Sequence, residues 1–214
     1  MKAKTRRQRF RELRVVVSKG LNASIAKLAQ EYLTDFPRHG LVWIDYGNAL
    51  ANLGKYKEAR TALLRAVKNV PAEHIDIPYY YLGRLYKNAG NHRRAVEWYK
   101  KASEVAPERG DYFIVLGVAY ISLEKTSEAQ ACFARAIECK EGMIEEAYYN
   151  LGVILAGQRK YKNALTCFEK ALQLDPKYKL AKQALVDMKT ALLIKGTANN
   201  LSKTRSRKAS SLLL

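Results

Sequence analysis

A fourfold internal repeat, with a period of about 35 residues, limits the fold of this chain more than any other feature. The glycines Gly47, Gly83, Gly117 and Gly152 lie 36, 34 and 35 residues apart. An aromatic residue precedes each glycine by four positions, and the second half of each unit has two alanines flanking a bulky apolar residue. These positions recur at helical spacing, so each unit is predicted to form two helices joined by a turn.

The side-chain size at each repeated position follows from the way two helices pack. Glycine and alanine are expected where the helices cross closely, and the large residues are expected to fill the space between them. Glycines with a positive φ are expected at the turns, at Gly54, Gly90 and Gly157. Prolines are expected to stop the second helix of three units, at Pro71, Pro107 and Pro176. One such unit cannot bury its apolar face alone, so neighbouring units are expected to stack.

With these positions, residues 40–178 resemble the tetratricopeptide repeat family. The resemblance implies an all-α fold, a right-handed superhelical solenoid of helix-turn-helix repeats. Before the clear units, Pro37 lies 34 residues ahead of Pro71, and Leu13 stands where the repeat glycine would be, which indicates a degenerate leading helix pair. The expected organisation is a basic arm with this pair at 1–39, repeats at 40–73, 76–109, 110–143 and 145–178, a capping helix at 179–194 and a disordered basic tail at 195–214.

The net charge of +18 is concentrated at the two ends of the chain. Residues 1–40 contain 10 Lys and Arg against 3 acidic residues, and residues 195–214 contain 5 against none, so these segments carry 12 of the 18 charges. Basic segments of this kind attract polyanions with little sequence preference. The alternative function is therefore an RNA- or ribosome-associated protein that binds polyanions through Arg6, Arg7, Arg9, Arg11, Arg14, Lys203, Arg205, Arg207 and Lys208.

The resemblance also implies where a partner would bind. In tetratricopeptide repeat proteins the first helices of the units line the concave face, which usually accepts a peptide or a helix. The inward positions include the residues Asp45, Asn48, Tyr80, Tyr81, Arg84, Ile114, Val115, Val118, Tyr149, Asn150 and Val153. The middle of this set is apolar and aromatic, which favours an apolar or amphipathic partner segment. Two alternatives are that strong curvature or the chain's own tail covers these side chains.

One subclass of the family clamps the carboxylate of a chaperone's C-terminus with lysine, arginine and asparagine side chains. Asn48 matches that pattern, whereas Tyr81, Asp111 and Val115 depart from it. A carboxylate at this place would meet Asp111 instead of a cation. The expected function is therefore a scaffold, adaptor or chaperone-like protein that holds a partner peptide or helix without this clamp.

Signals for catalysis and for membrane insertion are weak in this sequence. No phosphate-binding glycine loop, nucleophile motif or metal-ligand spacing is found, so neither an enzymatic activity nor a cofactor is expected. Cys132 and Cys167 lie 35 residues apart, at equivalent positions of successive units, which favours packing over redox chemistry. The longest uncharged apolar stretch is too short to span a bilayer, and a soluble cytoplasmic protein is expected. The basic N-terminus is also similar to a mitochondrial presequence.

Overall fold

The structure is a computed structural model that describes residues 5–194, and this part of the chain is helical without a strand. In chain order the helices are α1 (Arg6–Ser18), α2 (Asn22–Asp35), α3 (Gly40–Asn52), α4 (Tyr56–Asn69), the 3-10 turn η1 (Ala72–His74), α5 (Asp76–Asn88), α6 (His92–Val105), α7 (Gly110–Ile121), α8 (Thr126–Glu138), α9 (Ile144–Gly157) and α10 (Tyr161–Leu174). A further helix covers residues 179–194.

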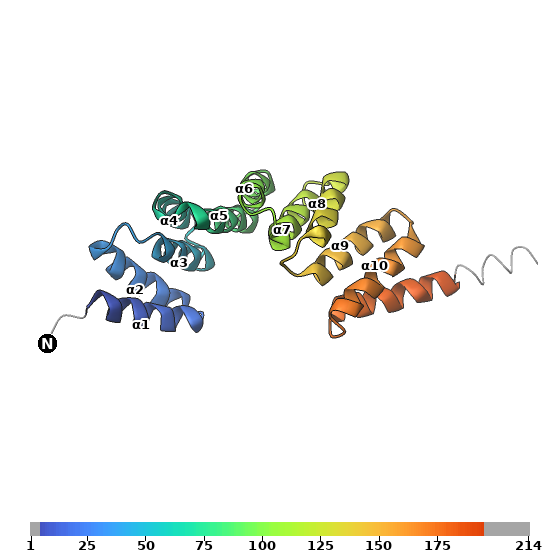
Figure 1. Cartoon of the computed structure of the whole chain (residues 1–214), viewed down its shortest axis with the longest axis horizontal. Helices are drawn as coiled ribbons and strands as arrows, with labels where there is room; N and C mark the ends of the chain where they lie inside the picture. Colours follow the sequence, from blue (N-terminus) through green and yellow to red (C-terminus); the bar gives the residue numbers. More distant parts are fainter. Residues whose placement is uncertain (1–4, 195–214) are drawn as a thin grey trace, which may run out of the picture.

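The helices pack in antiparallel pairs that follow one another along the chain, and together they form an arch (Figure 1). The second helices α4, α6 and α8 lie on the convex side of the arch, and the first helices α3, α5 and α7 lie nearer its concave side (Figure 1). Contacts also join α3 to α5 and α7 to α9, so successive first helices are neighbours. The arrangement confirms the predicted all-α solenoid, and it brings residues of separate units together on one concave face.

The repeated glycines lie where the two helices of a unit cross, as the sequence predicts. A Cβ added at Gly117 would lie 2.7 Å from Cε1 of Phe133, and one at Gly152 would lie 2.6 Å from Cε1 of Phe168. Both phenylalanine rings are buried, at 0% and 2% exposure. In these two units the glycine therefore makes room for the ring that fills the centre of the helix pair.

The prediction for one turn glycine is wrong. Gly54 and Gly90 have positive φ values of 76° and 74°, but Gly157 is the last residue of α9 and does not have a positive φ. In the third and fourth units the left-handed residues are instead Glu124 and Arg159, with φ of 60° and 62°. The geometry of the turn is the same in all units. Where the sequence has no glycine at the left-handed position, another residue adopts the positive φ.

The leading helix pair is held to the first unit by an aromatic cluster. Tyr32 is 2% exposed, and its ring packs against Phe10, Phe36 and His39. A hydrogen bond of 2.8 Å joins the hydroxyl of Tyr32 to Nδ1 of His39, just before α3. Leu13, which replaces the repeat glycine, is fully buried at 0% exposure. α1 and α2 therefore continue the solenoid despite their departure from the repeat pattern.

We expect the three thiols to react at different rates. Cys132 and Cys167 are buried in successive units, whereas Cys139 lies half-exposed after α8. Burial, with a contribution from Glu128, raises the pKa of Cys132 to about 11, so almost no reactive thiolate forms at pH 8. Iodoacetamide at pH 8 should modify Cys139 at least tenfold faster than the other two, as measured by peptide mass spectrometry. Equal modification rates in the folded protein would contradict the burial of Cys132 and Cys167. In urea the modification rates of all three thiols should converge.

Residues 5–194 contain no helix with the length and apolar composition that a bilayer crossing requires.

Candidate binding site on the concave face

A cavity of about 330 Å³ lies between the helices α5 and α7, which are nearer the concave side of the arch (Figure 1), and the start of α9. This volume lies at the small end of the roughly 300–1,000 Å³ range of ligand sites. The lining residues are Ile77, Tyr80, Tyr81, Arg109, Asp111, Tyr112, Ile114, Val115, Met143 and Glu146. Four of them, Tyr80, Tyr81, Ile114 and Val115, belong to the predicted partner-binding set. The cavity is therefore the place where the structure brings the central predicted residues together.

Tyrosine rings form one wall of this cavity. The ring of Tyr80 lies edge-on to Tyr81, with centroids 5.3 Å apart, and tilted against Tyr112 at 5.7 Å. Behind them, the ring of Tyr99 is 1% exposed and 6.0 Å from Tyr80. Tyr80 and Tyr81 are only partly buried, so they present aromatic surface to the cavity. Ile114 is 2% exposed, so it supports the wall from behind with little surface of its own.

A buried polar network fixes the tyrosine wall between α5 and α7. The hydroxyl of Tyr112 donates to Oδ2 of Asp76 at 2.6 Å, and Nη1 of Arg109 lies 3.3 Å from the same oxygen. The Asp76 side chain is 8% exposed, whereas that of Arg109 is 37% exposed. Burial, followed by the hydrogen bond to Asp76, raises the pKa of Tyr112, so its hydroxyl remains a donor. This network was not predicted from the sequence, where its only signal is an acidic and a basic residue at the starts of neighbouring units.

The loop between α8 and α9 closes the cavity because it is seated on the start of α7. The N–H of Gly110 donates to the carbonyl of Glu141 at 2.7 Å, and the N–H of Met143 donates to Oδ1 of Asp111 at 2.9 Å. Gly142 has a φ of 122°, and a Cβ there would lie 2.8 Å from the N atom of Asp111. Only glycine meets both conditions. This seating brings Met143 and Glu146 to the edge of the cavity.

Carboxylates determine the charge at this edge of the cavity. Burial raises the pKa of Glu146, and the nearby charges of Asp111 and Glu145 raise it further. Its carboxylate therefore lies in a partly desolvated place beside like charges. A hydrogen bond with the Asn150 side chain and, to a smaller extent, the charge of Lys87 in α5 lower the pKa of Glu146 and so oppose this effect. The cavity thus combines an aromatic wall with an acidic rim.

The predicted residues toward the N-terminal end are bonded within the protein. Nη2 of Arg84 donates to Oδ1 of Asn48, and the guanidinium of Arg84 lies 4.7 Å above the ring of Tyr81. Nη1 of Arg14, in α1, donates to Oδ2 of Asp45 at 2.9 Å. These contacts join α1, α3 and α5 along the concave face. That Asp45, Asn48 and Arg84 form hydrogen bonds to a partner stays a prediction. Each of these side chains would have to bind the partner in addition to its present bonding partner within the protein.

The predicted residues nearer the C-terminus do not line the central cavity. Tyr149 packs against Tyr178, with ring centroids 5.4 Å apart, and the amide of Asn150 donates to the carbonyl of Glu146 at 2.9 Å. Val118 packs partly buried against the core between α7 and α9. Val153 is 44% exposed and lines a second, apolar cavity of about 390 Å³ against the helix of residues 179–194. The predicted set therefore spans two cavities.

Comparison with known proteins establishes the family. Sequence profiles described as tetratricopeptide repeat match residues 22–74, 77–109, 110–141 and 145–178. This chain belongs to the tetratricopeptide repeat family. The first match begins inside the leading helix pair, so the profiles cover both the degenerate unit's second helix and all four clear units.

Curated relatives share only part of their length with this tetratricopeptide repeat protein. The human protein O-mannosyl-transferase TMTC1 is 27% identical over 139 residues, which are 65% of this chain and 15% of the relative. Human tetratricopeptide repeat protein 7A is 29% identical over 134 residues, which are 63% of this chain and 15% of the relative. Because this chain spans about 15% of either relative, their activities are not transferred to it.

Solved structures share the fold at low sequence identity. MamA from Desulfovibrio magneticus RS-1 aligns with a TM-score of 0.68 at 18% identity, over 82% of this chain and 98% of that chain. YrrB, described as a TPR protein with an unusual peptide-binding site, aligns with a TM-score of 0.61 at 20% identity, over 80% and 87%. The first TPR of Spaghetti (RPAP3), bound to an HSP90 peptide, aligns with a TM-score of 0.52 at 22% identity, over 58% and 97%.

The basic N-terminal arm is partly used to hold this tetratricopeptide repeat protein together. Nε of Arg6 donates to the hydroxyl of Tyr32 at 3.1 Å, Arg9 forms an ion pair with Asp35, and Arg14 binds Asp45. Arg7 and Arg11 are exposed. The other predicted polyanion-binding residues, Lys203, Arg205, Arg207 and Lys208, lie outside the described residues, as does the predicted disordered tail. Polyanion binding by these arms therefore stays a prediction.

Proposed function

We propose that this tetratricopeptide repeat protein is a protein-interaction scaffold that holds a segment of a partner against its concave face. The observation that carries the proposal is the cavity between α5, α7 and α9, where half-buried tyrosines stand beside an acidic rim. The wall is preorganised, because Asp76 and the loop before α9 fix its parts. A preorganised wall avoids the entropy cost of ordering side chains when a partner binds.

Two solved neighbours support the proposal at the level of the fold. YrrB is described with a peptide-binding site, and the Spaghetti repeat domain was solved with an HSP90 peptide. In this chain, however, Tyr81, Asp111 and Val115 stand where a carboxylate clamp would need cations or amides. We therefore propose an adaptor for a different segment, and not a receptor for a chaperone's acidic C-terminus.

A pair of matched double variants tests this function. Tyr81→Ala with Val115→Asp removes one ring from the cavity and places a charge on its apolar surface, so we expect at least tenfold weaker capture of partner proteins. Tyr56→Ala with Val105→Asp makes the same two changes away from the cavity, at exposed residues of α4 and α6. Both variants and the native protein are used to capture partners from nuclease-treated cell extract, with quantitative mass spectrometry as the readout.

The proposal requires that some proteins are retained by the native chain and by the control double variant. The same proteins must be lost by the variant Tyr81→Ala with Val115→Asp. Equal retention by all three proteins would contradict it. Loss of every partner on nuclease treatment alone would favour the predicted polyanion-binding arms instead. Circular dichroism of both variants confirms that the helices are intact.

A further inference from the structure

The charge at the cavity is opposite to that of the whole chain. The protein carries a net charge of +18, yet the acidic residues Asp111 and Glu146 line the cavity, and Glu145 lies near Glu146. Within residues 5–194 none of these three carboxylates forms an ion pair. The one cation in the lining, Arg109, is already paired with Asp76. A net negative charge therefore remains at the cavity, which Lys87 of α5 offsets only in part.

The first turns of α7 and α9, which contain these carboxylates, favour negative charge, whereas partial burial and like charges disfavour the ionised form of Glu146. Asp111 accepts one hydrogen bond, from the N–H of Met143, and this bond positions the loop without neutralising the charge. Half-buried Glu146 lies near both Asp111 and Glu145, and these like charges raise its pKa. A bound cation would offset both the repulsion between the carboxylates and the cost of their desolvation, so its binding would be favoured over that of a neutral group of equal size.

The aromatic wall is suited to the same kind of group. Cations bind over the faces of tyrosine rings, and this region already contains two such contacts. Arg84 lies 4.7 Å from the ring centre of Tyr81, and Arg109 lies 4.6 Å from that of Tyr112. The ring of Tyr80 packs among other tyrosines and also lines the cavity. An ammonium or guanidinium group near Tyr80 would therefore meet aromatic and carboxylate surface together.

The apolar part of the lining matches an alkyl stem more than a metal ion. Ile77, Val115 and the exposed Met143 line the same cavity, and a lysine or arginine side chain buries its methylene groups on such surfaces. Among the described residues no group of three or more His, Cys, Asp or Glu is placed to hold a metal ion. The volume of about 330 Å³ admits one long side chain.

We infer that this cavity binds a lysine or arginine side chain of the partner segment, with the charged group between Tyr80 and the carboxylates of Asp111 and Glu146. The inference rests on the proposed function and specifies the chemistry of its ligand. It makes the partner segment basic at one position, which is the opposite of the acidic peptides that a carboxylate clamp selects.

The direct test uses n-butylammonium, which reproduces the lysine side chain, with 1-butanol and butyrate as neutral and anionic counterparts. Methyl-labelled full-length protein is titrated, and the shifts of Ile77, Val115 and Met143 report binding at the cavity. We expect butylammonium to bind at least fivefold more tightly than butanol, and butyrate to bind more weakly than both. Equal or tighter binding of butanol or butyrate would overturn the inference.

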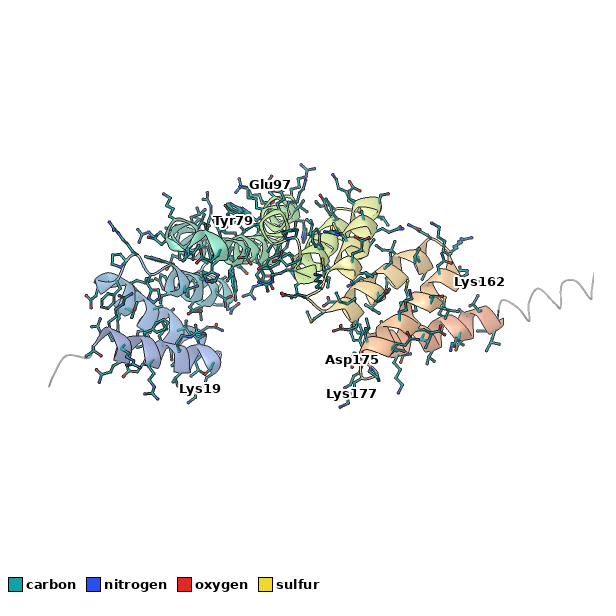
Figure 2. The ribbon with its side chains drawn as sticks, in the orientation of Figure 1. Lys19, Tyr79, Glu97, Lys162, Asp175 and Lys177 are labelled. Carbon is teal, nitrogen blue, oxygen red and sulfur yellow. The ribbon has the colours of Figure 1, made fainter. Side chains whose placement is uncertain are left out.

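Charge-removing variants connect the preference to the carboxylates. Glu146→Gln and Asp111→Asn remove one charge each, and asparagine can still accept the N–H of Met143. In each variant the preference for butylammonium over butanol should fall to less than twofold. Glu97→Gln makes the same chemical change on the convex side of α6 and should leave the preference intact (Figure 2). A preference that persists in both cavity variants would overturn the assignment.

The outcomes for the inference and for the proposed function are separable. If the cation preference is absent while the Tyr81 and Val115 variant still loses its partners, the scaffold function stands and the inference fails. If the preference is present while that variant retains all partners, the cavity binds cations but the scaffold function fails. If butylammonium causes no shift and Glu146→Gln alone moves the cavity methyl signals, a cation of the chain itself occupies the cavity, and the partner assignment is overturned.

Discussion

Phe133→Ala is expected to lower the free energy of unfolding by about 3–5 kcal/mol, which is the usual cost of removing a buried phenylalanine ring. The Phe133 side chain is 0% exposed, and its ring fills the crossing of α7 and α8 beside Gly117. The helices cannot move together to close the space, because their ends are held by the neighbouring units. Urea unfolding followed by circular dichroism gives the difference in stability.

A phenylalanine in the same unit provides the control for this prediction. Phe113 is only partly buried, and the guanidinium of Arg135 lies 5.9 Å from its ring centre. Phe113→Ala should therefore cost only about 1–2 kcal/mol, in proportion to the smaller apolar area that it buries. Equal losses for the two variants would contradict the packing around Gly117. Hydrogen exchange in Phe133→Ala should increase first in α7 and α8, because a solenoid unit contacts only its neighbours.

Asp76→Ala is expected to lower the free energy of unfolding by about 2–3 kcal/mol. Removing one member of a buried ion pair typically costs about 3–5 kcal/mol, because the partner is left desolvated and unpaired. The cost is smaller here, because the Arg109 side chain is 37% exposed and can be partly solvated. The hydroxyl of Tyr112 also loses its acceptor at 2.6 Å. Thermal and urea unfolding of the variant measure the loss.

Two comparisons isolate the effect of the buried network. Asp35→Ala removes a carboxylate of the same kind from the exposed pair with Arg9, where the side chains are 52% and 37% exposed, and should cost less than about 1 kcal/mol. Tyr112→Phe keeps the ring and the ion pair but deletes both hydrogen bonds of the hydroxyl, the one donated to Asp76 and the one accepted from Arg109, so we expect a loss of about 1–2 kcal/mol. If Asp76→Ala lowered the free energy of unfolding no more than Asp35→Ala does, the network around Asp76 would not stabilise the packing of α5 against α7.

The repeat pattern was sufficient to predict the helices, their pairing and the roles of residues such as Gly117 and Phe133. These features depend on contacts within one unit or between neighbouring units, so they recur in the sequence at a regular period. The resemblance to the family also implied that Tyr80, Tyr81 and Val115 belong to the concave face. The repeat pattern was wrong about Gly157, because the left-handed residue of that turn is Arg159. The path of the chain sets φ at the turn even where the residue is not glycine.

Contacts that occur at one place in the solenoid could not be predicted from the sequence. The bond between Asp76 and Tyr112 joins two units at positions that hold other residue types in the remaining units, so no periodic signal marks it. The seating of Gly142 on Asp111 likewise depends on the particular path of the loop before α9. The sequence alone determined which residues stack into a solenoid, because a local pattern of apolar side chains dictates helix pairing. Only the tertiary structure decided that an aromatic wall and an acidic rim meet in one cavity, because the packing between units determines which surfaces come together.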